Sequence, residues 1–263
     1  MPIPMGLSND CWYRLARFPD PPTSDVPLNP MRDALLKELH AAADPARAQG
    51  QQAYMKSAMP FFGVTVPQVR RIVSSLVRES PFADADAWQA TLLDIWRRAA
   101  KREERYAAVE ILNHAAHERW VTPSAFPTIE ELVVTGAWWD YVDAIASNAV
   151  GTALANDPCE VGALLRTWSV DPNIWKRRTA ILAQLKRGPH TDRVLLFDLI
   201  EPSIGETEFF LRKAIGWALR AYSKVEPDAV VSYVAANAGR LSPLTKREGL
   251  KTLLKSGVVE SLP

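Results

Sequence analysis

Residues 65–79, TVPQVRRIVSSLVRE, carry both the start signal and the apolar spacing of an α-helix. Thr65 and Gln68 have the spacing of a capping box, in which the hydroxyl of the first residue accepts from the backbone of the helix that follows. The apolar residues after them recur every three or four positions, which places them on one face. This stretch therefore predicts an amphipathic helix.

The same pattern extends from Met31 to the end of the sequence. Amphipathic segments of about 12 to 18 residues are separated by Pro, Gly, Asn or Asp. Further helices are expected to begin after Pro172, in DPNIWKRR, and after Pro243, in SPLTKREGL. We find no convincing pair of strands, since VVSYV near residue 230 fits a buried helix face as well as a strand. The predicted fold class is all-α.

About a dozen helices with short connections could pack as a globular bundle or as a solenoid of helix pairs. Strict sequence periodicity is absent, as in degenerate HEAT-like repeats, where only the apolar spacing recurs. We favour the solenoid because it offers a long concave surface. Residues 31–263 are expected to form one HEAT-like domain, and the proline-rich residues 1–30 a flexible arm without a core of its own.

The composition is that of a chain able to bury a large core, with 48% hydrophobic and 23% charged residues among 263. Cys11 and Cys159 lie far apart, which argues against a disulfide framework or a zinc ribbon. There is no apolar run long enough to span a membrane, and the first residues lack the features of a signal peptide. We therefore expect a cytoplasmic protein.

The net charge of +1 conceals an asymmetry between the two parts of the chain. Residues 172–263 hold 15 Lys and Arg against 9 Asp and Glu, whereas residues 1–171 hold 16 against 21. A basic half can bind a polyanion such as nucleic acid, although a solvated basic surface explains it equally well. The near-neutral total therefore does not exclude DNA as a partner.

Residues 136–145, GAWWDYVDAI, cluster two tryptophans with two aspartates. Trp138, Val142, Ile145 and Ala149 follow a helical spacing that predicts the core face. Trp139 and Asp143 are four residues apart and form the next stripe, so that the ring and the carboxylate should project together. An N-cap role could explain Asp140 or an earlier residue, but it does not easily explain Asp143, which lies a full turn inside the helix.

Residues 173–187, NIWKRRTAILAQLKR, place Arg178 along the apolar stripe of their helix. Because an unpaired buried charge is costly, Arg178 must either pair with a buried acid or reach a ligand such as a phosphate. The sequence leaves both alternatives open.

The expected helix 207–222, TEFFLRKAIGWALRAY, contains Gly216, which costs roughly 1 kcal/mol relative to Ala in a helix interior. A glycine there lets another backbone or a ligand approach closely. Lys213 and Arg220 flank Trp217 on one face, an aromatic and basic combination that can hold nucleic acid. A core tryptophan with solvated neighbours is the alternative.

Metal-dependent and nucleotide-dependent catalysis find little support. His114 and His117 have an H-x-x-H spacing, but no acid completes a metal triad, and we expect them on a solvated helix. The sequence has no Walker A loop, GxGxxG, GxSxG or HExxH motif.

From about residue 51 to 254 the sequence resembles the AlkD-type DNA alkylation repair glycosylases, a HEAT-like family. The blocks that carry the resemblance are AYMKSAMPFFGV, ELVVTGAWWDYVD, NIWKRRTAILAQLK, FFLRKAIGWALRAYSK and PLTKREGLK. By position, the resemblance implies that Asp143 is the catalytic carboxylate, with Trp139 and Trp217 as active-site aromatics. It implies DNA contacts for Arg178 and Tyr54, and we expect further contacts from Lys213 and Arg247.

The resemblance implies a monomeric glycosylase without a metal or other cofactor that acts on alkylated bases in double-stranded DNA. A purine alkylated at N3 or N7 is cationic and leaves as a neutral base, so one carboxylate that stabilises the oxocarbenium-like sugar can suffice. The family is thought to leave the damaged base in the stack, which would allow bulky adducts. Two alternatives stay open: a HEAT-like DNA-binding protein without excision activity, and a helical-repeat scaffold for protein interactions.

Overall fold

The computed structural model describes residues 29–262, and within that range the secondary structure is helical, with no β-strand. The helix expected from residues 65–79 forms as α4, Val66–Glu79. Its capping box is present, because the backbone N–H of Thr65 donates to Oε1 of Gln68 over 2.9 Å. Both the all-α class and this helix start are therefore confirmed.

The α-helices follow one another along the chain with short connections. They are α2 (Pro30–Ala41), α3 (Pro45–Met55), α4, α5 (Ala85–Arg97), α6 (Arg102–Leu112), α7 (Phe126–Gly136), α8 (Trp139–Ile145), α9 (Gly151–Asn156), α10 (Pro158–Ser169), α11 (Ile174–Leu182), α12 (Arg193–Ile200), α13 (Phe209–Tyr222), α14 (Pro227–Ala236) and α15 (Pro243–Ser256). A π-helical turn, Ala146–Val150, joins α8 to α9. The 3₁₀ turns are Ala115–Trp120, Pro123–Ala125, Gly188–His190 and Glu201–Ser203.

Side-chain caps and prolines explain where most of these helices begin. Each cap accepts a hydrogen bond from a backbone N–H of the first turn, which would otherwise lack a partner. The capping residues are Asn29, Asp44, Asp84, Asp157, Asn173, Asp192, Glu208 and Ser242. The polar and proline residues that punctuate the sequence thus act as helix starts.

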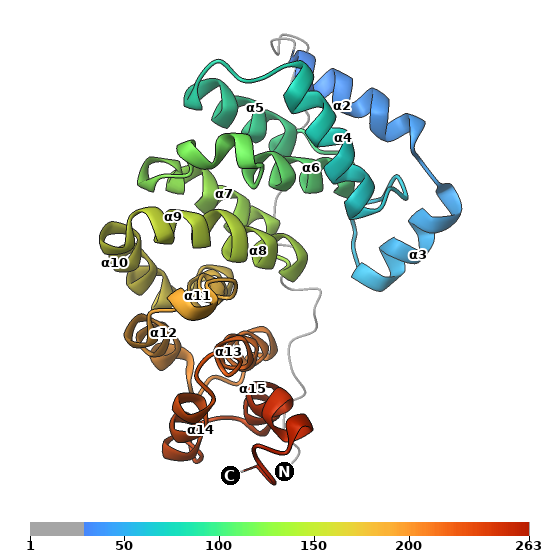
Figure 1. Cartoon of the computed structure of the whole chain (residues 1–263). Coiled ribbons are helices and arrows are strands. Elements are labelled where there is room, and N and C mark those ends of the chain that lie inside the picture. The colour runs from blue at the N-terminus through green and yellow to red at the C-terminus, as the bar shows by residue number, and fades with distance from the viewer. Residues whose placement is uncertain (1–28, 263) are drawn as a thin grey trace, which may run out of the picture.

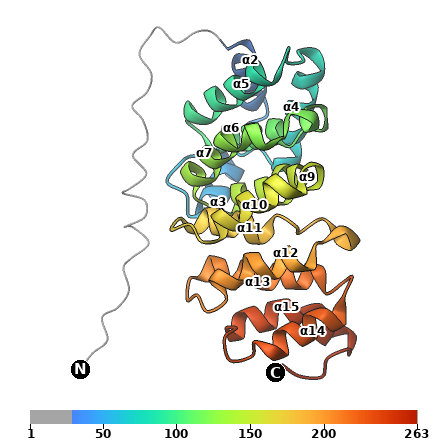
Figure 2. The ribbon, with the colours of Figure 1, turned by 90° about the vertical axis from the view of Figure 1, so that its left-hand side faces the viewer.

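The helices stack as a solenoid of successive layers (Figure 2). In the C-terminal part, α10, α12 and α14 lie along one side of the stack, and α11, α13 and α15 lie along the other (Figure 1). We call the second row, with α8 before it, the inner row. Helix α3 stands away from the stack, on the side of the inner row (Figure 1).

The hydrophobic core runs along the stack as two clusters of buried side chains. The first extends from α2 to α12 and includes the fully buried Trp88, Trp96 and Tyr141. The second joins α11 to α15 and includes Leu211, Ile215 and Leu219 of α13. Because the clusters meet at α11, that helix is packed from both sides, and it carries Arg178.

Two of the expected helices are shorter in the structure. The helix expected over 173–187 ends at Leu182, and the one expected over 207–222 begins at Phe209. The ambiguous VVSYV lies in α14 and is helical. The arm expected over residues 1–30 lies, up to residue 28, outside the described residues. None of the described helices is long and apolar enough to cross a membrane.

Candidate active site

Asp143 and Arg178 form a buried ion pair between α8 and α11. Nε and Nη2 of Arg178 donate to Oδ1 and Oδ2 of Asp143 over 2.7 and 2.8 Å. Asp143 is 8% exposed and Arg178 only 4%. The remaining Nη1 donates to the backbone carbonyl of Phe210, at the start of α13. One guanidinium therefore ties together three consecutive helices of the inner row and fixes the orientation of the carboxylate.

Two opposing effects set the pKa of Asp143. Burial raises it above the usual value, whereas the hydrogen bonds and the charge of Arg178 lower it, and the raising effect is the larger. Each oxygen accepts one N–H from Arg178 and keeps a second lone-pair direction. The carboxylate is thus rigidly held, with capacity left to accept from water or to face a developing positive charge.

The helix formed by GAWWDYVDAI buries its expected core stripe. Val142 and Ile145 are fully inaccessible, as the core stripe predicts. Trp138 is the N-cap of α8, and its ring packs edge-on against the ring of Phe210, with centroids 5.6 Å apart. Trp139, the first residue of α8, is half-buried and lies one turn before Asp143.

Asp140 is not the N-cap of α8, because Trp138 occupies that position. Its carboxylate instead accepts from Nη2 of Arg102 over 2.7 Å and from the hydroxyl of Tyr106 over 2.6 Å. Arg102 is 6% exposed and also lies over the ring of Tyr141. This second buried ion pair joins α6 to α8, and the sequence analysis did not predict it. The sequence offered no signal for it, because an N-cap role already explained Asp140 and its partner lies 38 residues earlier.

The second expected aromatic, Trp217, lies on α13 and is 37% exposed. It stands two helical turns after Phe210, whose carbonyl holds Arg178. Gly216 allows the close approach of a backbone, and not of a ligand, because a Cβ there would lie 3.1 Å from the Thr245 carbonyl oxygen of α15. The core alternative for Trp217 is wrong, since more than a third of the side chain meets solvent.

The cations expected to contact DNA differ in their protein partners and in their exposure. Lys213 donates to Glu248 over 2.9 Å, whereas Arg247 of α15 is exposed. Tyr54 is 76% exposed near the end of α3. The structure thus brings Asp143 and Arg178 into contact and places Trp139 one helical turn before Asp143. It places Trp217 and Lys213 on the adjoining α13, and Tyr54 on the separate α3 (Figure 1). The DNA contact of Arg178 stays a prediction.

Helix α3 is held through a buried carboxylate that the sequence reasoning also missed. Glu103 of α6 is fully buried and accepts the backbone N–H groups of Phe62, Gly63 and Val64 over 2.8 to 3.0 Å. Gly63 has a φ of +90°, and a Cβ there would lie 2.0 Å from the Asp44 carbonyl oxygen. These contacts fix the segment that follows α3, and so the position of Tyr54.

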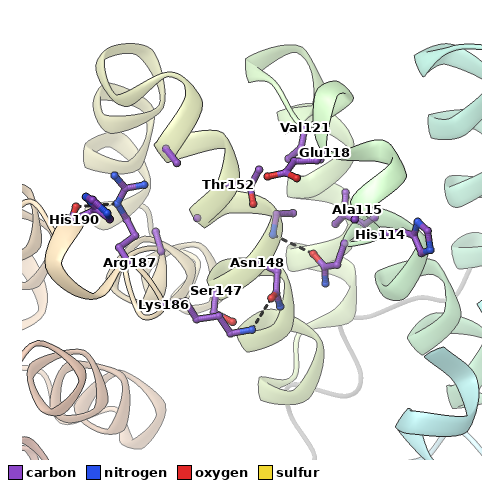
Figure 3. A pocket seen from close by; sticks show the side chains of 16 residues that line it. His114, Ala115, Glu118, Val121, Ser147, Asn148, Thr152, Lys186, Arg187 and His190 are labelled. Carbon is purple, nitrogen blue, oxygen red and sulfur yellow. Dashed lines mark hydrogen bonds between the residues drawn. The ribbon is translucent and has the colours of Figure 1, made fainter. Parts of the chain in front are cut away.

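A pocket of about 650 Å³ opens one turn beyond Asp143. Ser147, at its wall, donates to the Asp143 carbonyl oxygen over 2.7 Å. Figure 3 shows Arg187 and His190 on one side of the pocket and His114 on the other. Sequence spacing does not predict this pocket, because its walls come from the end of α6, the 3₁₀ turn after it, the π-helical turn, α9 and the segment after α11.

His114 and His117 were expected on a solvated helix, and the structure does not confirm this. His117 is 2% exposed and stacks on Trp120, with ring centroids 5.4 Å apart, and burial lowers its pKa. Among residues 29–262, no group of three or more His, Cys, Asp or Glu side chains is arranged to hold a metal ion.

Comparison with known proteins identifies the family of the chain. A family model described as DNA alkylation repair enzyme matches residues 35–253. The chain is also similar to the solved structure of a predicted DNA alkylation repair enzyme from Enterococcus faecalis, with a TM-score of 0.74 and 30% sequence identity. That similarity covers 81% of this chain and 97% of the other. The comparison with curated proteins gives no match. The chain therefore belongs to the DNA alkylation repair enzyme family.

Proposed function

We propose that this protein is a monofunctional DNA glycosylase that hydrolyses the N-glycosidic bond of purines alkylated at N3 or N7. The observation that carries the proposal is the Asp143 carboxylate, held by both oxygens on Arg178 and placed one turn after Trp139. A membership in a DNA repair family supports DNA as the substrate. The enzyme is expected to act as a cytoplasmic monomer.

The chemistry follows from the charge of the lesion. A purine alkylated at N3 or N7 carries a positive charge and becomes neutral as it leaves, so no general acid is needed to protonate it. The sugar acquires oxocarbenium character, and Asp143 stabilises that charge and orients the attacking water. Because Arg178 fixes the carboxylate before DNA arrives, little reorganisation is required at the moment of reaction.

The aromatic and basic side chains supply binding. Trp139 and Trp217 offer ring faces to the deoxyribose and the cationic base, at about 0.5 to 2 kcal/mol for each cation–aromatic contact. Tyr54, Lys213 and Arg247 contact the DNA backbone, together with Arg178. Contacts that are mainly to the backbone would leave the damaged base in the stack, and bulky adducts would then be tolerated.

The decisive variant is Asp143→Asn, which keeps the size of the side chain and removes its charge. We expect release of 7-methylguanine from duplex DNA to fall by about 10² to 10³-fold, the usual loss when one electrostatic stabiliser is removed. Binding to duplex DNA should stay nearly unchanged. The matched control is Asp198→Asn, an exposed aspartate of α12 paired with Arg166, which should excise at the wild-type rate.

The assay should cover 7-methylguanine, 3-methyladenine and one bulkier cationic adduct. Wild-type protein that binds duplex DNA but releases none of the three would remove the catalytic assignment. Equal loss in the Asp143 and Asp198 variants would show that a general change of charge, and not the carboxylate, is responsible.

One observation favours a second candidate, a DNA-binding protein of this fold without excision activity. Asp143 and Arg178 are almost inaccessible and satisfy each other, as the members of a purely structural ion pair would. In that case Asp143→Asn would lower the free energy of unfolding, and the wild-type protein would still bind duplex DNA without releasing a base.

A further inference from the structure

Two cations of α13 share one carboxylate from α15. Lys213 and Arg220 are seven residues apart, so they lie on the same face of the helix, about two turns from each other. Nζ of Lys213 donates to Oε1 of Glu248 over 2.9 Å, and Nη1 of Arg220 donates to Oε2 over 3.0 Å. Trp217 stands between the two cations in the sequence and is 37% exposed. We call Lys213, Arg220 and Glu248 the cation clamp.

Close packing of α13 on α15 places the carboxylate between the cations. A Cβ on Gly216 would lie 2.6 Å from the Cβ of Glu248, so the stem of Glu248 rests directly on the backbone of α13. Gly249, the next residue, lies in the same contact. The hydrogen bond from Lys213, followed by the charges of Lys213 and Arg220, lowers the pKa of Glu248. Its position and its negative charge are therefore both held by the fold.

The clamp opens toward solvent on its cationic side. The side chains of Lys213 and Arg220 are 38% and 24% exposed, whereas that of Glu248 is 16% exposed. An ammonium has three N–H donors and a guanidinium has five, and the hydrogen bond to Glu248 uses one on each cation. The spare donors can meet an incoming anion with two oxygens, which is the chemistry of a phosphodiester.

We propose that Lys213 and Arg220 bind a phosphodiester of the DNA backbone, and that Glu248 is a built-in competing anion at this site. The inference rests on the DNA substrate of the proposed function. Without DNA, Glu248 keeps two like charges together that would otherwise repel each other. With DNA, its charge opposes the phosphate, so the site binds the backbone more weakly than two free cations would. Affinity for undamaged duplex, which arises from phosphate contacts, is thereby restrained.

The test measures equilibrium binding of an unmodified duplex by fluorescence anisotropy over a series of salt concentrations. Glu248→Gln keeps the size of the side chain and removes its charge. We expect binding about three- to tenfold tighter near 0.1 M salt, because one like charge close to the phosphate is lost. The slope of log K against log salt should become steeper by up to about one, since the cations are no longer neutralised internally. Glu201→Gln, an exposed glutamate paired with Arg240, is the matched control.

The gain must depend on the two cations. In a Lys213→Met, Arg220→Met background, Glu248→Gln should give no tightening. Should that double variant fail to fold, as thermal melting would show, Lys213→Met alone serves, and the gain must then fall by at least half. The proposal is overturned if Glu248→Gln weakens or does not change binding, if Glu201→Gln gives an equal gain, or if the gain persists without the cations. Unmodified DNA keeps these outcomes separate from any failure of base excision.

Discussion

At the scale of single residues, the sequence predicted the environment of Arg178 but not its partner. Its spacing placed it on the apolar face of its helix and required either a buried acid or a ligand. The structure supplies the acid, and it is Asp143, the residue that the family resemblance marks as catalytic. Helical spacing could not name that acid, because the two residues are 35 positions apart and belong to different helices.

The pair predicts how excision depends on pH. In the proposed mechanism excision needs the ionised carboxylate, so activity should be lost as the pH falls through the pKa of Asp143, which burial has already raised. Arg178→Lys keeps a cation but loses the paired hydrogen bonds that lower this pKa. We therefore expect the acidic limb of the single-turnover rate of Arg178→Lys to move to higher pH. Relative to the wild type, the variant should lose less of its rate at pH 8 than at pH 6.

The matched control for this prediction is Arg166→Lys, since Arg166 also donates twice to an aspartate, but on the exposed surface. Its pH profile should overlay that of the wild type. An Arg178→Lys profile that falls equally at every pH would mean that Arg178 does not act through the protonation of Asp143.

At the scale of elements, two helix glycines that look alike in the sequence should behave in opposite ways. Gly50 lies inside α3, and a Cβ there would meet nothing within 4 Å. Gly50→Ala should therefore raise the free energy of unfolding by up to about 1 kcal/mol. Gly216→Ala gains the same propensity but forces α13 away from Glu248 and Thr245, so it should destabilise by about 1 to 3 kcal/mol.

Urea unfolding of the two variants beside the wild type measures both effects under the same conditions. If Gly216→Ala were as stable as Gly50→Ala, the close contact between α13 and α15 would be wrong. The position of Glu248 in the cation clamp would then lose its structural basis.

Element boundaries were predicted less well than element types. The apolar stripe of residues 173–187 continues to Leu185, but the helix ends at Leu182 and the chain continues in turns, with Leu185 N–H donating to the Leu182 carbonyl oxygen. Leu185 still packs against the second core cluster. Leu185 is therefore packed against the core although it lies beyond the end of the helix. Apolar spacing alone cannot distinguish a packed residue in a helix from one in the turn that follows it.

At the scale of the whole molecule, the repeat is visible in contacts that the sequence could not show. Side chains that pair between helices meet at nearly constant separations along the chain: 38 residues for Arg102 of α6 with Asp140 of α8, 35 for Asp143 of α8 with Arg178 of α11, and 35 for Lys213 of α13 with Glu248 of α15. The residue types at these positions differ from layer to layer, so no letter pattern repeats. Apolar spacing predicted the helices, but it left bundle and solenoid both open and could not predict the register between the layers.

The basic C-terminal part of the chain supplies fewer free cations than its composition suggests. Of its 15 Lys and Arg residues, six form ion pairs within the described structure: Lys176, Arg177, Arg178, Lys213, Arg220 and Arg240. Each phosphate that is neutralised contributes about 0.9 to the slope of log K against log salt. We therefore expect binding to duplex DNA to weaken steeply with salt, but with a slope well below the value that 15 contacts would give.

The exposed Arg247 tests which cations contribute. Arg247→Gln should weaken binding of any duplex sequence to a similar extent and reduce the slope by about one, because a phosphate contact carries no sequence information. Arg240→Gln removes the same charge, but Arg240 is already paired with Glu201, so the slope should not change. Equal slopes for the two variants would mean that net charge alone, and not the α15 surface, governs DNA binding by the whole molecule.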